Sequence, residues 1–177
     1  MKKIPTFFGM LTLALASLTT QAADDAFREA LGKELDNRAV ARQVVGALAE
    51  HHQGTPQGAF WSAYAALEQH NIPLYQPVAA RHGLSASRLK TTLKAGASIP
   101  FARLFPERFL TMLAGATQDY LAGMRAVAPP AAAEDRAFLQ YMIAQESVQA
   151  SALAQAAGQR FAQATGELEG FLRQAQE

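Results

Sequence analysis

Residues 139–171 read LQYMIAQESVQASALAQAAGQRFAQATGELEGF. Apolar side chains and one carboxylate recur in this stretch at steps of one, three or four residues, which is the spacing of one face of an α-helix. The pattern predicts a single helix from about Glu134 nearly to the C-terminus. Such a long apolar face must be covered by other helices, because an exposed one would drive association. The face comprises Leu139, Met142, Ile143, Glu146, Ala150, Leu153, Ala157, Phe161, Ala164, Leu168 and Phe171.

The remaining chain repeats the helical spacing and contains no convincing strand alternation. Asp24 and Asp25 are expected to cap the first helix, since short acidic side chains suit a helix N-terminus. Proline disfavours helix in the residue before it, so a break is expected at residues 71–73. The prediction is an all-α fold, a single compact bundle of about five helices. Besides the last helix, the expected helices cover residues 25–53, 57–70, 74–82, about 85–95 and about 106–127.

Composition limits the class of protein further. The chain has 177 residues, of which 50% are hydrophobic and 18% charged, and it has no cysteine. This length fits one domain, and the apolar content is too high for a disordered chain. Disulfide-stapled folds, cysteine-ligated zinc sites and lipid-modified cysteine are excluded.

Residues 1–22 have the three parts of a secretory signal peptide. A cationic start at Lys2 and Lys3 precedes an apolar run over 4–18, and small residues precede a cleavage position after Ala22. The run is shorter than a membrane-spanning helix requires. We therefore expect a cleaved peptide at 1–22, a helical-bundle domain at 23–177, no transmembrane segment after cleavage, and a periplasmic location.

Cleavage also changes the charge balance of the chain. Loss of Lys2 and Lys3 changes the formal net charge from +1 to −1. No global positive charge then remains to attract nucleic acid, so no nucleic-acid partner is expected.

The segment QPVAARHGLSASRLKTTLKAG, residues 76–96, resembles the helix-turn-helix of DNA-binding proteins. The resemblance implies two short helices around a turn at Gly83. An exported protein does not meet the genome, however, and this local geometry is common in proteins that never bind DNA. We interpret the segment as a helical elbow whose basic outer surface, within residues 81–108, binds a protein partner in the cell envelope. The predicted partner-binding residues are Arg81, Arg88, Lys90, Lys94 and Arg103.

Glu146 interrupts the apolar face of the last predicted helix. A carboxylate in that position costs several kcal/mol unless it is paired, hydrogen-bonded or metal-bound. One interpretation is a structural contact, such as a pair with an arginine. The alternative is a functional carboxylate in a metal- or small-ligand-binding bundle. Its candidate metal ligands are Glu68, Glu146, His51 and His52.

The metal alternative lacks the motif of carboxylate-bridged di-metal bundles. Those bundles use Glu-x-x-His pairs, and this chain contains none. No cofactor is therefore predicted, and a metal stays an alternative. A carrier of a small apolar ligand would instead need a cavity near Phe105, Phe109, Phe138 and Phe161.

Motifs for covalent catalysis are absent from the sequence. It has no cysteine nucleophile, no G-x-S-x-G elbow and no glycine-rich phosphate loop. The sequence therefore favours a non-catalytic, exported binding protein, for example of the inhibitor or immunity type. The alternative function is a metal- or small-ligand-binding bundle.

Overall fold

The computed structural model describes the backbone of residues 8–175, and the side chains from residue 20 onward except those of residues 89 and 90. Over this range it is 86% helical, with six helices and no strand, which confirms the predicted all-α bundle. The signal-peptide prediction rests partly on residues 1–7, which lie outside the described range. The helices are α1 (Phe8–His51), α2 (Pro56–Arg81), α3 (Arg88–Leu104), α4 (Pro106–Arg125), α5 (Ala133–Ala157) and α6 (Phe161–Gln174).

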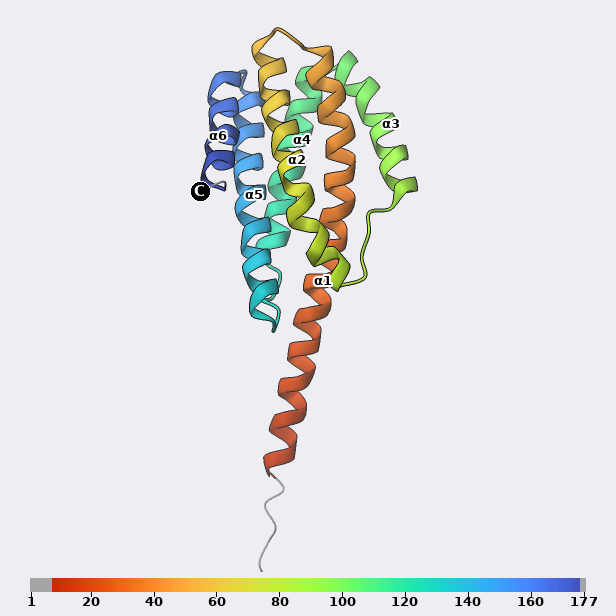
Figure 1. Cartoon of the computed structure of the whole chain (residues 1–177), viewed down its shortest axis with the longest axis vertical. Helices are drawn as coiled ribbons and strands as arrows, with labels where there is room; N and C mark the ends of the chain where they lie inside the picture. Colours follow the sequence, from red (N-terminus) through yellow and green to blue (C-terminus); the bar gives the residue numbers. More distant parts are fainter. Residues whose placement is uncertain (1–7, 176–177) are drawn as a thin grey trace, which may run out of the picture.

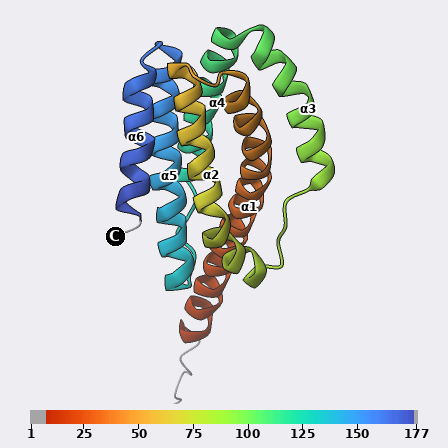
Figure 2. The ribbon, with the colours of Figure 1, turned by 45° about the horizontal axis from the view of Figure 1, so that its top comes forward.

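The helices form a ring in which each packs against its neighbours. Going round, α1 packs on α2, α2 on α6, α6 on α5, and α5 on α4. Helix α3 lies on the outside of the bundle and bridges α1 and α4 (Figures 1 and 2). The N-terminal part of α1 projects beyond the other helices (Figure 1). Helix α3 links α1 to α4. These two long helices leave space between them.

The core has two apolar parts separated by a polar layer. One part contains Phe60, Trp61 and Leu153. The other contains Phe27, Leu31 and Leu139. Between them, along α1, α2 and α5, the buried side chains are polar or charged: Glu34, Arg38, Glu68, Asn71, Gln145, Glu146 and Gln149. The two apolar parts of the core therefore enclose a buried cluster of charged and polar side chains.

The turn between α1 and α2 explains the predicted stop at residues 54–56. The Thr55 hydroxyl accepts a hydrogen bond from the Gly58 amide at 3.0 Å and donates one to the His52 carbonyl at 2.7 Å. This is an N-cap, and Pro56 follows at the first helical position, where its missing N–H costs nothing. A Cβ on Gly58 would lie 2.1 Å from the His52 carbonyl oxygen, so only glycine permits this approach.

The prediction of a single last helix is wrong. The chain turns at Gly158 and Gln159, and α6 packs back against α5 and α2. Gln159 has φ 60°, and the Arg160 amide bonds to the Gln155 carbonyl at 2.9 Å, which ends α5. The apolar spacing survives the break because each half keeps its own buried face. Periodicity alone therefore cannot distinguish one long helix from a hairpin of two.

Replacing Gln159 by glycine is expected to stabilise the protein. A side chain in the left-handed conformation costs about 1 kcal/mol that glycine avoids. We expect the midpoint of urea unfolding of Gln159→Gly to rise by the equivalent of about 0.5–1 kcal/mol. Gln163→Gly, at an exposed position within α6, is the matched control and should lower stability. A loss of stability in Gln159→Gly would contradict the left-handed turn.

Two predicted helix ends are also wrong. Helix α2 continues through residues 71–73 with Pro73 and Pro77 inside it, and α3 continues past Gly96 to Leu104 with Pro100 inside it. Burial of Asn71 and Tyr75 against neighbouring helices outweighs the local preference of proline in α2. Helix α1 already includes Asp24 and Asp25, so they do not cap it. Asp24 instead accepts a hydrogen bond from the Ala131 amide at 2.8 Å.

The structure contains the two helices and the turn of the predicted elbow at residues 76–96, but not their expected packing. The end of α2 and α3 are joined by residues 82–87, with Gly83 at φ 61°. Helix α3 packs against α1 and α4 rather than forming a compact pair with α2 (Figure 2). The segment therefore differs from a helix-turn-helix in the packing of its two helices.

Candidate functional site

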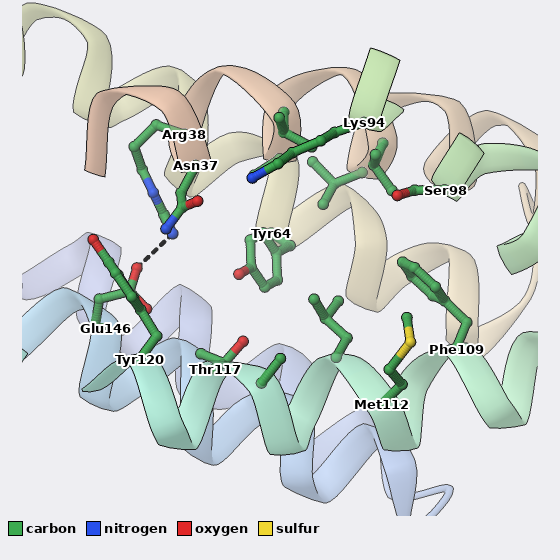
Figure 3. A pocket seen from close by; sticks show the side chains of 16 residues that line it. Asn37, Arg38, Tyr64, Lys94, Ser98, Phe109, Met112, Thr117, Tyr120 and Glu146 are labelled. Atoms are coloured by element: carbon green, nitrogen blue, oxygen red, sulfur yellow. Dashed lines mark hydrogen bonds and ion pairs between the residues drawn. The ribbon is translucent and has the colours of Figure 1, made fainter. Parts of the chain in front are cut away.

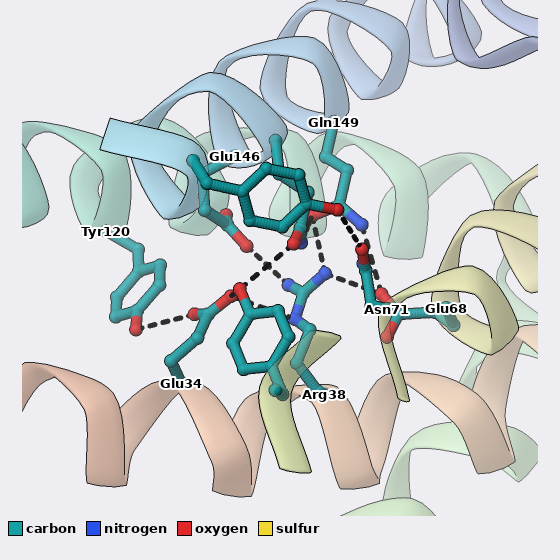
Figure 4. A network of polar contacts seen from close by, with 10 residues as sticks. Glu34, Arg38, Glu68, Asn71, Tyr120, Glu146 and Gln149 are labelled. Carbon is teal, nitrogen blue, oxygen red and sulfur yellow. Dashed lines mark hydrogen bonds and ion pairs between the residues drawn. The ribbon is translucent and has the colours of Figure 1, made fainter. Parts of the chain in front are cut away.

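The buried polar layer is centred on the guanidinium of Arg38 (Figure 4). Its Nη1 donates to Glu68 Oε1 at 2.5 Å and to Gln149 Oε1 at 2.6 Å. Its Nη2 donates to Glu146, and its Nε lies 3.2 Å from Glu34 Oε1. One cation from α1 thus faces three carboxyl groups from α1, α2 and α5. The interpretation that Glu146 is paired with an arginine is confirmed.

Tyrosine hydroxyls complete the surroundings of Glu34. Tyr75 donates to Glu34 Oε1 at 3.0 Å, and Tyr120 donates to Glu34 Oε2 at 2.8 Å. Burial and the charge of Glu34 raise the pKa of both tyrosines, so they remain protonated donors. Both carboxyl oxygens of Glu34 therefore accept a hydrogen bond from a tyrosine.

The other two carboxyl groups are pushed toward the neutral form. Burial raises the pKa of Glu146 to about 8, with the charges of Glu34 and Glu68 adding to the effect and Arg38 opposing it. Burial likewise raises the pKa of Glu68 against the opposing effect of Arg38. Both carboxyl groups are therefore easier to protonate than an exposed glutamate.

A cavity of about 390 Å³ lies between α1 and α4 and reaches this cluster (Figure 3). Its polar end is formed by Arg38, Glu146 and Tyr120, together with Asn37 and Thr117. Its other walls are apolar and come from α1 and α4: Val40, Ala41, Val44, Val45, Phe109, Met112, Leu113 and Ala116. The volume is in the range of small-molecule sites, which combine apolar walls with a few polar groups.

Three further polar side chains line the cavity: Tyr64, Lys94 and Ser98. Tyr64, on α2, is only 4% exposed, and its hydroxyl has no hydrogen-bond partner among the described residues. Lys94, on α3, extends across the opening, with its ammonium toward Tyr64 and Asn37 (Figure 3). Within the described part of the chain Lys94 likewise forms no ion pair or hydrogen bond. A ligand atom in the cavity could form hydrogen bonds with both Tyr64 and Lys94.

The predicted metal ligands lie at two separate places in the structure. Glu68 and Glu146 meet at Arg38, whereas His51 and His52 lie at the end of α1 and contact each other at 4.7 Å between ring centroids. The thirteen helical residues from Arg38 to His51 correspond to about 20 Å along the axis. Among the side chains that the structure describes, no three histidines or acids are grouped to hold a metal ion.

The basic residues predicted to bind a partner also lie in different surroundings. Arg81 is committed to the bundle, since it pairs with Asp135 at 2.7 Å and Glu134 at 3.4 Å. Arg88, Lys94 and Arg103 are all exposed on α3, and Lys94 also lines the cavity. The side chain of Lys90 lies outside the described residues. Of the four phenylalanines proposed for a cavity, only Phe109 lines the one described.

Sequence reasoning missed Arg38, although a signal was present. Glu34 and Arg38 continue the spacing of Phe27 and Leu31 on one face of α1, so two charged residues stand in an apolar stripe. The same argument that identified Glu146 would have identified them. The cavity had no such signal, because it depends on the separation of α1 from α4.

The fold and the site together define a helical bundle with a buried arginine–carboxylate cluster and an adjoining cavity. No protein-family model, curated protein or solved structure matches this chain. Among the described residues, no helix is both long enough and apolar enough to cross a membrane.

Proposed function

We propose that this protein is a non-catalytic binding protein of the periplasm that holds a small amphipathic molecule in the cavity between α1 and α4. The observation that carries the proposal is the cavity itself, which joins apolar walls to a polar end containing Arg38, Glu146 and Tyr64. The absence of nucleophile and phosphate-loop motifs supports binding rather than covalent catalysis. The features of residues 1–22 support export.

A neutral fluorescent probe tests this function. We expect N-phenyl-1-naphthylamine to bind the purified protein with one-to-one stoichiometry and enhanced fluorescence. Ala116 lies at the edge of the cavity, so Ala116→Phe should fill the space and weaken binding by about tenfold or more. Ala122→Phe, an exposed position on the same helix, is the matched control and should bind the probe normally. No saturable binding, or equal binding by both variants, would contradict the proposal.

The second candidate function is binding of an acidic protein partner in the cell envelope. The supporting observation is a surface of α3 and α4 that exposes large apolar side chains: Leu93 (66%), Leu104 (71%), Phe105 (48%) and Met112 (53%). Exposed Arg103 and Arg108 flank Leu104 and Phe105, and one acid, Glu107, lies between them. Apolar contact surrounded by cations is complementary to an acidic partner.

A photo-crosslinker tests this surface. Placed at Leu104 in cells that express the protein, it should give one defined crosslinked product, whereas the same group at Ala122 should give none. Arg103→Glu should abolish the product at Leu104, because it reverses the charge that the partner meets. A product that is unchanged by Arg103→Glu would contradict an acidic partner.

A further inference from the structure

The charges around the cavity favour an anionic ligand. Its charged lining residues are Arg38, Lys94 and Glu146. Glu34 and Glu68 lie behind this lining and are engaged, Glu34 by Tyr75 and Tyr120 and Glu68 by Arg38 and Gln149. Two cations therefore meet a single cavity carboxyl, whose pKa burial raises to about 8. The carboxyls of the cluster compensate Arg38, so Lys94 is the cation of the lining that has no carboxylate partner among the described residues.

The polar groups at this end are also donors. Lys94 carries an ammonium with no acceptor among the described residues. The Tyr64 hydroxyl is unpaired, and burial keeps it protonated by raising its pKa. The Asn37 amide and the hydroxyls of Thr117 and Ser98 can each donate as well. The ammonium of Lys94 can only donate and the other groups can donate, so together they are complementary to a carboxylate, which accepts several hydrogen bonds.

We propose that the cavity binds an organic carboxylate with a compact apolar body. The carboxylate lies between Lys94 and Tyr64, and the apolar body lies along Val44, Leu113 and Met112. Resting on the proposed function above, this inference names the ligand class of that site. The position of Lys94 on α3 also gives the bridging helix a role, since it brings a cation over the gap between α1 and α4 (Figure 3).

Three ligands with the same chain and different heads test the inference. Octanoate, 1-octanol and octylamine are titrated into the purified protein at pH 7, below their micelle concentrations, by isothermal titration calorimetry. We expect octanoate to bind about tenfold or more tightly than the other two, because only its carboxylate can accept a charge-assisted hydrogen bond from Lys94. Lys94→Gln should remove this preference without changing the affinity for octanol.

Two variants control for the mechanism. Lys33→Gln removes an exposed lysine charge from α1 outside the cavity and should leave all three affinities unchanged. Tyr64→Phe keeps the core packed and should weaken octanoate severalfold more than octanol.

The outcomes separate the inference from the function on which it rests. Similar affinities for all three ligands would leave the cavity as a binding site and overturn the preference for anions. Tightest binding of octylamine would overturn it too, and would show that Glu146 is ionised and controls the site. No binding of any of the three, together with failure of the neutral probe, would overturn the proposed function itself.

Discussion

Replacing Arg38 by methionine is expected to destabilise the protein by about 3–5 kcal/mol at pH 7.5, since removing one partner of a buried ionic cluster leaves the others uncompensated. The guanidinium contacts Glu34, Glu68 and Glu146, all of which are buried. Their charges hold the pKa of Arg38 well above its usual range despite its burial, which acts in the opposite direction. Methionine fills much of the same volume, so the loss is electrostatic rather than a large cavity.

The pH dependence of this loss distinguishes charge from packing. At pH 4.5 the carboxyl groups are largely neutral in Arg38→Met, so its deficit should shrink to that of the lost hydrogen bonds, about 1–2 kcal/mol. Urea unfolding of the wild type and the variant at both pH values measures the two deficits. Arg28→Met, at an exposed position of the same helix, should change stability by less than about 0.5 kcal/mol. An equal deficit at both pH values would show that Arg38 acts through packing.

Adding Glu68→Gln and Glu146→Gln to Arg38→Met gives a second, independent result. These substitutions remove the buried carboxyls that the lost cation had compensated. We expect the triple variant to recover much of the stability at pH 7.5, because a buried ionic cluster can be replaced by neutral groups at little net cost. Additive losses would show that the three residues do not act as a unit.

The sequence predicts the buried polar layer only in part, and the reason is physical. Glu146 stands out because its whole neighbourhood is apolar, and burial of a charge there requires a partner. The identity of that partner is a long-range property, since Arg38 and Glu146 are 108 residues apart. The spacing of Glu34 and Arg38 places both on the buried face of α1, but spacing does not reveal which helix that face meets.

Helix ends were predicted where a local group decides them and missed where packing decides them. Thr55 and Pro56 cap α2 through contacts within a few residues, so the sequence predicts that end. Pro73 and Pro100 remain inside helices because neighbouring helices bury the surrounding turns. The cavity arises in the same way from the arrangement of α1, α3 and α4, which no local pattern encodes.

The free energy of unfolding is expected to fall as pH rises from 6.5 to about 8. The pKa of Glu146 is raised from its usual value of 4.5 to about 8, mainly by burial. Between these values the unfolded chain has released a proton that the folded protein retains, so stability declines by up to about 1.4 kcal/mol per pH unit for each such proton. The stabilising contribution of Glu146 is therefore fully present below pH 4.5, and it is lost as the pH rises through about 8.

Two other titrating groups set the lower end of the pH range in which this decline can be measured. Burial and the neighbouring His51 lower the pKa of His52 from 6.5, so stability from His52 rises with pH up to that value and opposes the trend. The pKa of Asp135 is lowered from 3.8: burial opposes the shift, and hydrogen bonds from Arg81 and His82 outweigh it. Its contribution is therefore lost only as pH falls below that value. The effect of the buried carboxyls on the free energy of unfolding is therefore best measured above pH 6.5.

Glu146→Gln tests the assignment of the slope to this residue. Glutamine keeps the shape and a hydrogen-bond donor toward Glu34 but cannot ionise. We expect the variant to be within about 1 kcal/mol of the wild type at pH 5 and a few kcal/mol more stable at pH 8, as measured by urea unfolding at constant ionic strength. Any slope that remains should disappear when Glu68→Gln is added, because burial raises the pKa of Glu68 as well. Glu29→Gln is the control, since its exposed pair with Lys33 lowers the pKa of Glu29 and keeps its titration below this window. Wild-type stability that does not fall between pH 6.5 and 8 would show that Arg38 holds both buried carboxyls ionised.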